Sequence, residues 1–184
     1  MTAAQICSCL ALLPGLCAAQ PNADPFPRPA SKKGLQVQMV DDAISLGIHH
    51  AGINASLGAL FFMGEHPGAL KRTFEGRDCF INQNYARSLD AQIKPLTDAG
   101  VVVNMILLAY PTKDAAKDAL LLHPKAKADG KYNIAAFNTA TQDGLWLYRA
   151  LIDFLAERYS GAHTEYGRAW GWIIGNEVNS QWLW

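Results

Sequence analysis

The run Val101–Leu108 (VVVNMILL) constrains the fold of this chain more than any other stretch. Apolar residues occupy both faces of the expected strand, and Asn104 is its one polar residue. Such a run is typical of a parallel sheet that is covered on both faces. Three further short apolar runs, Leu35–Val40, Ile48–Ile53 and Trp170–Ile174, predict strands of the same kind.

Helical patterns separate these predicted strands. Tyr85, Leu89, Ile93 and Leu96 recur at helical spacing, with Pro95 expected to kink the helix. Residues 59–84 are less regular and predict a long loop, or a hairpin around Gly76. The predicted helices span residues 41–46, Tyr85–Ala99, Lys113–Leu122 and a segment that begins near Thr141 or Asp143 and ends at Tyr159. This alternation of strands and helices predicts a parallel α/β domain.

Two parallel α/β architectures fit the alternation. A doubly wound sheet that binds a nucleotide should carry a Gly-rich turn after its first strand, whereas this chain has Met39-Val40-Asp41-Asp42 there. The pattern therefore favours a (β/α)8 barrel. Because a complete barrel takes about 250 residues and the chain has 184, we expect about the first four β/α units. Such a half would be prone to self-association through its open edges.

The amino terminus predicts export. Residues 1–19 have an apolar region, Ile6–Leu16, with Cys17 and Ala19 placed for cleavage before Gln20, which is typical of a signal peptide. That region is too short to span a membrane, which takes about 20 apolar residues. Residues 20–33 are Pro-rich and predict a linker to a domain over 34–184. The protein is therefore expected to be secreted or periplasmic.

Composition limits the partners of this domain. The chain has 16 Lys and Arg and 16 Asp and Glu, so its formal net charge is zero. It therefore has no excess of positive charge that would indicate binding to nucleic acid or an anionic membrane. After removal of the signal peptide, Cys79 would be the only cysteine, so no disulfide framework is expected. No cofactor is implied by any motif.

The most informative polar residues follow the last predicted strand, in WGWIIGNEVNSQWLW, which spans Trp170 to Trp184. Asn176 and Glu177 stand at the carboxyl end of that strand, and an ionisable carboxylate there is costly unless it is paired or functional. An apolar strand that ends in Asn-Glu resembles the fourth strand of clan A glycoside hydrolases, which are (β/α)8 barrels. From SKKGLQ to WIIGNEVNSQWLW, the sequence is also similar to a bacterial family of unknown function.

The resemblance to clan A implies a retaining hydrolysis of O-glycosidic bonds in an oligo- or polysaccharide. Glu177 would be the general acid/base, and Asn176 would hydrogen-bond the 2-hydroxyl of the sugar. In that clan, the nucleophile is a second Glu after the seventh strand, which lies outside the four predicted units. Further candidates for substrate contacts are Asn54 and Tyr110 at strand ends, and Trp182 and Trp184 as stacking surfaces.

Two other classes of protein remain compatible with the sequence. A barrel of this kind could bind glycans without cleaving them, or it could be a hydrolase that uses a metal. Substitution of Glu177 and analysis of bound zinc would separate these alternatives.

Overall fold

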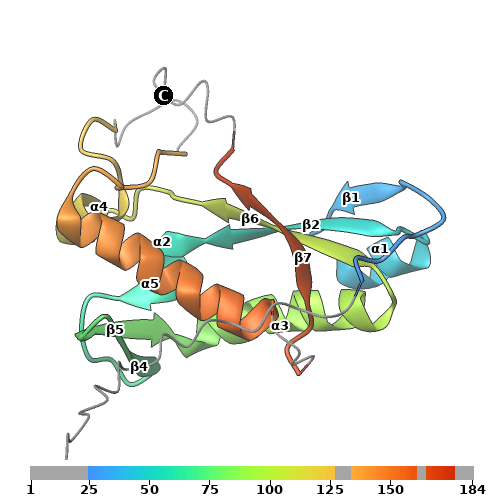
Figure 1. The fold of residues 1–184 in the computed structure, drawn as a ribbon, viewed down its shortest axis with the longest axis horizontal. Coiled ribbons are helices and arrows are strands. Elements are labelled where there is room, and N and C mark those ends of the chain that lie inside the picture. Colours follow the sequence, from blue (N-terminus) through green and yellow to red (C-terminus); the bar gives the residue numbers. More distant parts are fainter. Residues whose placement is uncertain (1–24, 127–133, 161–164, 177–184) are drawn as a thin grey trace, which may run out of the picture.

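The computed structural model describes residues 25–126, 134–160 and 165–176. Its centre is a four-stranded sheet of β1 (Gly34–Gln36), β2 (His50–Ser56), β6 (Val102–Leu108) and β7 (Ala169–Ile174). All neighbouring strands are parallel, and their order in the sheet, β1-β2-β6-β7, is their order in the chain (Figure 1). The predicted parallel α/β domain is therefore confirmed at this level.

All five described helices bury their apolar residues in one core, on one face of the sheet. The sheet contributes alternate residues to this core, such as Ala51 and Ile53 of β2 and Val103 and Met105 of β6. The helices are α1 (Val40–Ser45), α2 (Leu57–Leu60), α3 (Gln83–Asp98), α4 (Ala115–Leu121) and α5 (Gln142–Tyr159). None of them is long and apolar enough to cross a membrane.

The opposite face of the sheet carries small, polar and apolar side chains, and we call it the open face. Gly52 and Asn54 of β2 lie beside Asn104 and Ile106 of β6 in register. Gly171 of β7 pairs with Asn104, and a Cβ atom at Gly171 would lie only 2.1 Å from the Asn104 Oδ1. The absence of a side chain at Gly171 therefore makes room for a polar side chain on this face. No described helix buries an apolar residue against it.

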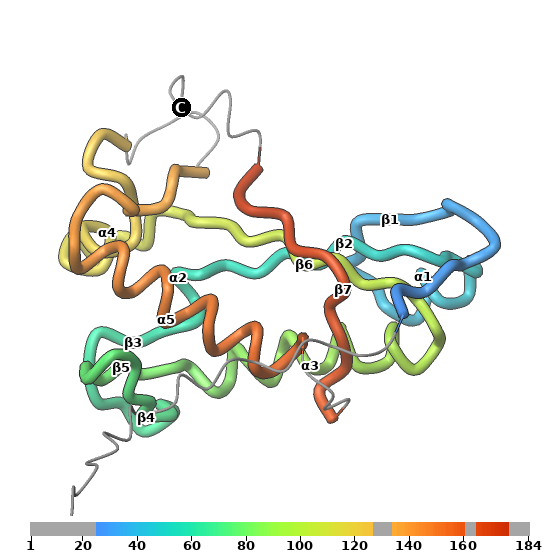
Figure 2. The backbone as a smooth tube through the Cα atoms, in the orientation of Figure 1, coloured from blue at the N-terminus to red at the C-terminus, as the bar shows by residue number. Residues whose placement is uncertain are grey.

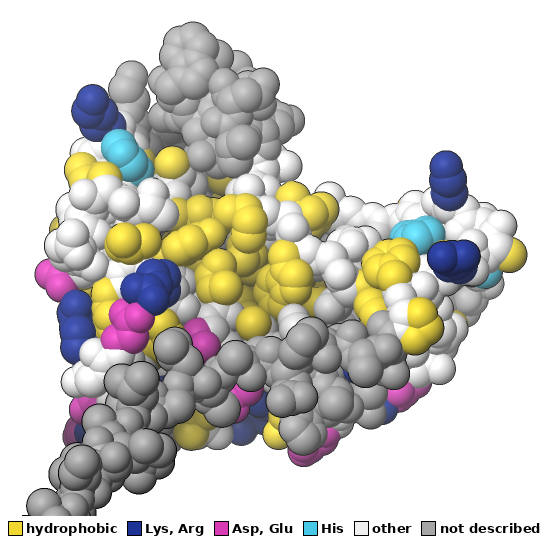
Figure 3. Space-filling model, viewed as in Figure 1, with side chains coloured by type: hydrophobic (Ala, Val, Ile, Leu, Met, Phe, Trp, Pro, Cys, Tyr) yellow, Lys and Arg dark blue, Asp and Glu magenta, His cyan; other side chains and the backbone are white. Residues whose placement is uncertain are grey.

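The surface beside β7 is apolar. Ile173 and Ile174 at its carboxyl end are each 48% exposed. Hydrophobic side chains gather in the middle of one side of the molecule, between β7 and α5 (Figure 3). Exposed apolar surface of this kind usually marks a place where further structure or a partner packs.

A second, antiparallel sheet lies between β2 and α3 in the chain. It consists of β3 (Phe61–Phe62), β4 (Ala69–Phe74) and β5 (Arg77–Asn82), in the order β3-β5-β4. Glu75 and Gly76 form the two-residue turn between β4 and β5, with φ of 48° and 74°, as a type I′ hairpin requires. The hairpin alternative predicted for residues 59–84 is thus correct.

The antiparallel sheet lies beside α5 (Figure 2). The indole Nε1 of Trp146 donates a 3.0 Å hydrogen bond to the Phe74 carbonyl beside the turn. Arg149 pairs with Glu75 in the turn, and Arg72 of β4 pairs with Glu157 near the end of α5. The hairpin is therefore held along much of the length of this helix.

An ion pair joins α3 to α5. The Arg158 guanidinium donates to both carboxylate oxygens of Asp90, at 2.8 and 2.6 Å. The two side chains are only 16% and 17% exposed. The buried hydroxyl of Tyr159 donates to the same carboxylate at 2.8 Å. Burial, followed by the nearby Asp90 carboxylate, raises the pKa of Tyr159, so this hydroxyl remains a donor.

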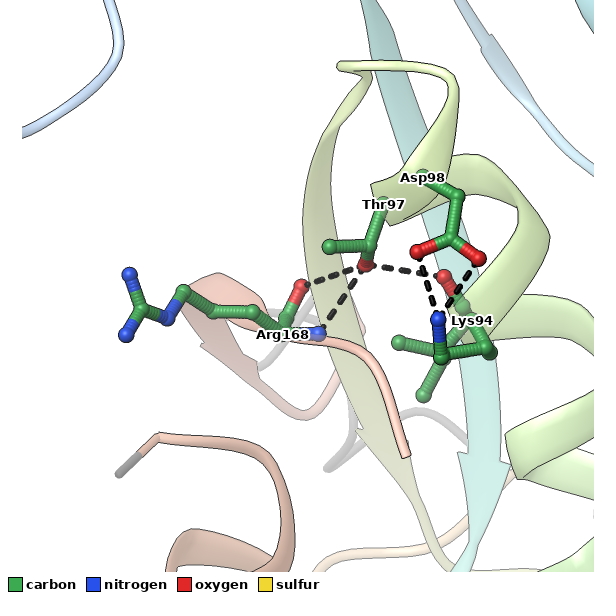
Figure 4. A network of polar contacts seen from close by, with 5 residues as sticks. Lys94, Thr97, Asp98 and Arg168 are labelled. Carbon is green, nitrogen blue, oxygen red and sulfur yellow. Dashed lines mark hydrogen bonds and ion pairs between the residues drawn. The ribbon is translucent and has the colours of Figure 1, made fainter. Parts of the chain in front are cut away.

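The amino end of β7 is fixed to the last turn of α3 (Figure 4). The Thr97 hydroxyl accepts from the Arg168 amide at 2.9 Å and donates to the Ile93 carbonyl at 2.9 Å. Gly167 precedes this contact with φ of 86°, and a Cβ there would lie 2.9 Å from the Ile93 backbone. Only glycine combines this conformation with such a close approach.

Several predicted bounds change. The first strand ends at Gln36 and Val40 already begins α1, so the predicted strand Leu35–Val40 is wrong over its second half. β2 continues to Ser56, beyond the predicted Ile53. Phe26 lies within the predicted linker, and its ring contacts Trp170 of β7 edge-on at 5.6 Å between centroids. The predicted signal peptide, residues 1–19, lies outside the described residues.

Candidate functional site

The carboxyl ends of the parallel strands meet at one edge of the sheet. Ser56 at the end of β2 pairs with Leu108 at the end of β6, and Leu107 pairs with Ile174 at the end of β7. One residue further, the Gly175 amide donates to the Leu107 carbonyl at 2.9 Å, which extends the ladder beyond β7. Because the carboxyl edge of a parallel sheet is where α/β proteins place their sites, we treat it as the candidate site.

Two of the predicted site residues stand at this edge. Tyr110 follows the last residue of β6 by two positions, and Asn176 follows the last residue of β7 by two positions. Asn176 is exposed, while Tyr110 is half-buried. Burial raises the pKa of the Tyr110 hydroxyl, so it remains protonated and able to donate at neutral pH.

Asn54 lies deeper on the open face than predicted. The prediction placed it at the end of its strand, but β2 runs on to Ser56, so Asn54 is within the strand. Its side chain is exposed and its Oδ1 accepts a 2.9 Å hydrogen bond from Gln36 Nε2 of β1. This amide pair spans β1 and β2 below the carboxyl edge.

Tyr85, at the start of α3, also reaches the edge. Its hydroxyl accepts a 2.7 Å hydrogen bond from the Ser56 amide, at the end of β2. Burial raises the pKa of Tyr85, the Ser56 N–H opposes this rise, and the nearby Tyr110 adds to it. The two tyrosine side chains therefore lie close enough to interact electrostatically. Helical spacing assigned Tyr85 to the core, so sequence reasoning missed it.

The connection after β6 forms an ordered rim along the edge. Asp118 of α4 accepts hydrogen bonds from the Thr112 amide and hydroxyl, at 2.8 and 2.6 Å, which fixes the loop that follows Tyr110. The Ala135 amide donates to the Ala109 carbonyl at 2.9 Å, so the return segment runs beside the end of β6. The candidate site thus has a preformed wall on the β6 side.

Lys117 joins this rim to the antiparallel sheet. Its ammonium donates to the Phe61 carbonyl at 2.7 Å and lies 4.4 Å from the centre of the Phe61 ring. Burial lowers the pKa of Lys117, against the opposing effect of Asp114 and Asp118. Because its ammonium is engaged with Phe61, we assign Lys117 a structural role in the rim.

A family model matches residues 25–184, a range that includes every described residue. The matching family is DUF5722, a family of unknown function. The chain belongs to DUF5722. The predicted similarity to a family of unknown function is thus confirmed. No curated protein and no solved structure matches the chain.

Three of the site residues predicted for this DUF5722 chain, Glu177, Trp182 and Trp184, lie outside the described residues. Asn176, which precedes Glu177 in the sequence, is described and follows β7 at the carboxyl edge. Within the described ranges, no group of three or more His, Cys, Asp or Glu side chains could hold a metal ion.

Proposed function

We propose that this DUF5722 chain forms one wall of a (β/α)8 barrel. A doubly wound sheet reverses its strand order and places helices on both faces. Here each of the four parallel strands is added on the same side of the previous one. Right-handed crossovers then place all helices on one face, as in a barrel, and leave the other face for the barrel interior. In this arrangement the open face, with Asn54, Asn104 and Gly171 beside Ile106, would line the barrel interior.

The apolar surface beside β7 supports the same architecture. Closing a barrel requires eight strands, four more than are described. The fifth strand would pair with the free edge of β7, and its helix would pack next to α5. Ile173 and Ile174 at 48% exposure lie where these elements would cover them.

For this barrel we propose a glycoside hydrolase activity with Glu177 as general acid/base. The observation that supports this proposal is the position of Asn176. This residue precedes Glu177 in the sequence and lies at the same carboxyl edge as Tyr110. Hydrolysis with retention needs a proton donor and a nucleophilic carboxylate about 5–5.5 Å apart. In this proposal the nucleophile comes from a strand beyond the four described.

The other residues of the edge take supporting roles in this mechanism. Asn176 would bind the sugar 2-hydroxyl, and Tyr110 would donate a hydrogen bond from its protonated hydroxyl. Asn54 would contact a sugar ring from the barrel interior, while Trp182 and Trp184 would stack on its apolar face. The substrate would be an oligo- or polysaccharide outside the cytoplasm if residues 1–19 direct export.

Glu177→Gln in the full-length protein tests the proposal. With an activated aryl glycoside as substrate, whose leaving group needs little protonation, loss of the general base should slow hydrolysis of the glycosyl-enzyme and lower kcat by about 10²–10⁴-fold. Azide should restore turnover by attacking the glycosyl-enzyme, because it needs no general base, and the product should be a glycosyl azide. Glu165→Gln is the matched control, since Glu165 is exposed and precedes β7 at the opposite edge.

Two outcomes contradict the proposal. Unchanged kcat in the Glu177→Gln variant would remove this residue from the chemistry. A wild-type protein that binds oligosaccharides but cleaves no glycoside would favour the non-catalytic alternative instead.

A further inference from the structure

The outer face of the antiparallel sheet carries an aromatic groove. Side chains alternate along each strand, so Phe61 of β3 and Ile81 of β5 point into the core. Their neighbours Phe62 and Phe80 therefore point outward, and the two are paired across the strands. Lys71 of β4 pairs with Phe80 on its other side. Two aromatic rings and one ammonium group thus follow one another across this face.

His66 completes the aromatic surface. Its imidazole stacks on the Phe62 ring, with 3.9 Å between centroids and 16° between planes. The Gly68 amide donates to His66 Nδ1 at 3.1 Å, which fixes the ring and leaves Nε2 for other partners. The groove beside these rings has a volume of about 440 Å³, within the range of small-molecule sites. Its lining residues are Glu65, His66, Pro67, Ala69, Lys71 and Phe80.

The charges at the groove balance one another. The Lys71 ammonium lies 2.8 Å from the Asp78 carboxylate. The hydrogen bond and charge of Asp78 raise the pKa of Lys71, and Glu65 adds to the rise. Because this one cation already faces two carboxylates, the groove offers no surplus of positive charge to a phosphate or a uronate. It does offer donors and acceptors to neutral hydroxyl groups.

We propose that this groove is a second carbohydrate-binding site, which holds a neutral sugar ring of a polysaccharide. The apolar wall of Phe80, Pro67 and Ala69 suits the C–H face of a pyranose. Glu65, Lys71 and His66 surround that wall and can bind the equatorial hydroxyl groups. The antiparallel sheet lies far from the carboxyl end of β7 (Figure 1), so the groove is separate from the part of the candidate site that β7 forms.

This inference rests on the proposed carbohydrate function and extends it. In a polymer-degrading enzyme, a second site raises the local concentration of substrate at the first. Removal of the groove should therefore weaken retention on a polymer, without affecting a small substrate that occupies only the strand-end site.

The test is affinity electrophoresis of the full-length protein in gels that contain one polysaccharide each. The neutral probes are xylan, β-glucan and galactomannan, and the anionic probe is alginate. We expect retardation in at least one neutral gel and roughly tenfold weaker binding for Phe80→Ala, a magnitude typical of the loss of an aromatic contact. Glu65→Gln, which removes a charge but little volume, should also weaken binding.

The controls separate this proposal from the active-site proposal. Phe26→Ala removes an aromatic residue that is 56% exposed but lies beside β7, and it should leave retardation unchanged. Phe80→Ala should leave aryl glycoside hydrolysis at the wild-type rate, whereas Glu177→Gln should slow hydrolysis and retain polymer binding. Circular dichroism of each variant checks its folding.

Three results would overturn the groove proposal. In the first, Phe80→Ala and Glu65→Gln are both retarded as strongly as the wild-type protein. In the second, Phe26→Ala weakens retardation as much as Phe80→Ala does. In the third, the wild-type protein is not retarded in any neutral gel. Failure of Glu177→Gln to affect hydrolysis would instead count against the active-site proposal and leave the polymer-binding result standing.

Discussion

Replacing Asp90 with alanine should be one of the most destabilising single changes in this protein. The Asp90 carboxylate accepts hydrogen bonds from Nε and Nη2 of the Arg158 guanidinium and from the Tyr159 hydroxyl. In the alanine variant, the Arg158 charge stays between α3 and α5 without its carboxylate. The Tyr159 hydroxyl keeps only a long contact to the Ala86 carbonyl, at 3.4 Å.

The magnitude follows from these two losses. Breaking a buried ion pair by removing one partner costs about 3–5 kcal/mol. Because the two side chains retain 16% and 17% exposure, water can reach the remaining charge, and the lower value of about 3 kcal/mol applies. The lost hydrogen bond of Tyr159 adds about 1 kcal/mol. The sum of about 4 kcal/mol corresponds to a decrease in Tm of roughly 8–16 °C.

Urea denaturation followed by circular dichroism measures this difference, with unchanged m values as the check on two-state unfolding. Asp98→Ala is the control, because Asp98 pairs with Lys94 on the exposed surface of α3, at 58% and 39% exposure. That variant should lose no more than about 0.5 kcal/mol. A loss below about 1 kcal/mol in Asp90→Ala would show that solvent compensates the pair and would refute the reasoning. The double variant Asp90→Leu with Arg158→Met should be more stable than Asp90→Ala, since no charge remains buried.

Two further variants address the backbone and the buried thiol. Gly167→Ala should destabilise the fold by about 3 kcal/mol, because an alanine there would be in the left-handed conformation, with its Cβ atom 2.9 Å from Ile93. The control is Gly47→Ala, which shares the left-handed conformation but has no atom within 4 Å, and it should cost about 1 kcal/mol. Equal losses in the two variants, measured by urea titration, would contradict the close packing at Gly167. Burial raises the pKa of Cys79 to about 11 despite the nearby Arg72, so alkylation of Cys79 at pH 8, followed by mass spectrometry of its peptide, should proceed only as fast as the protein unfolds. The stability that the protonated thiol provides is complete below about pH 9 and is lost as the pH rises to about 11. The difference in unfolding free energy between wild type and Cys79→Ala should therefore shift by roughly 2–3 kcal/mol over that interval, and a constant difference would show that the thiol is accessible.

Local patterns predicted the central sheet because its strands are short apolar runs with few alternatives. Val101–Leu108 was expected as a strand and forms β6 from Val102. Thr141 was one of two candidates for the start of the last helix, and its hydroxyl accepts from the Gly144 amide as the cap. These features depend on residues close together in the chain, so the sequence contains their signal.

Features that depend on distant residues were predicted less well. Val37 and Met39 extend the apolar pattern of the first strand, but Met39 is 67% exposed and Val40 begins α1, whose first turn contains Asp41 and Asp42. Residues 69–82 were expected only as a loop or hairpin, because the charged residues Lys71, Arg72, Arg77 and Asp78 interrupt their apolar pattern.

The candidate site shows the same limit. Asn176 and Tyr110 could be placed at the carboxyl edge from strand ends alone. Tyr85 could not, because its contact with Ser56 joins segments 29 residues apart. Helical periodicity reports that a tyrosine faces inward, but it does not report which backbone group its hydroxyl meets.

The attachment of the β4–β5 hairpin to α5 has a consequence for how the domain assembles and opens. The hairpin leaves the ribosome well before the helix that anchors its turn through Trp146 and Arg149. Until α5 is synthesised, this antiparallel ribbon lacks its support, and a two-stranded ribbon alone is only marginally stable. In the finished protein, amide hydrogens of the hairpin and of the first half of α5 should exchange with solvent together, as one cooperative unit.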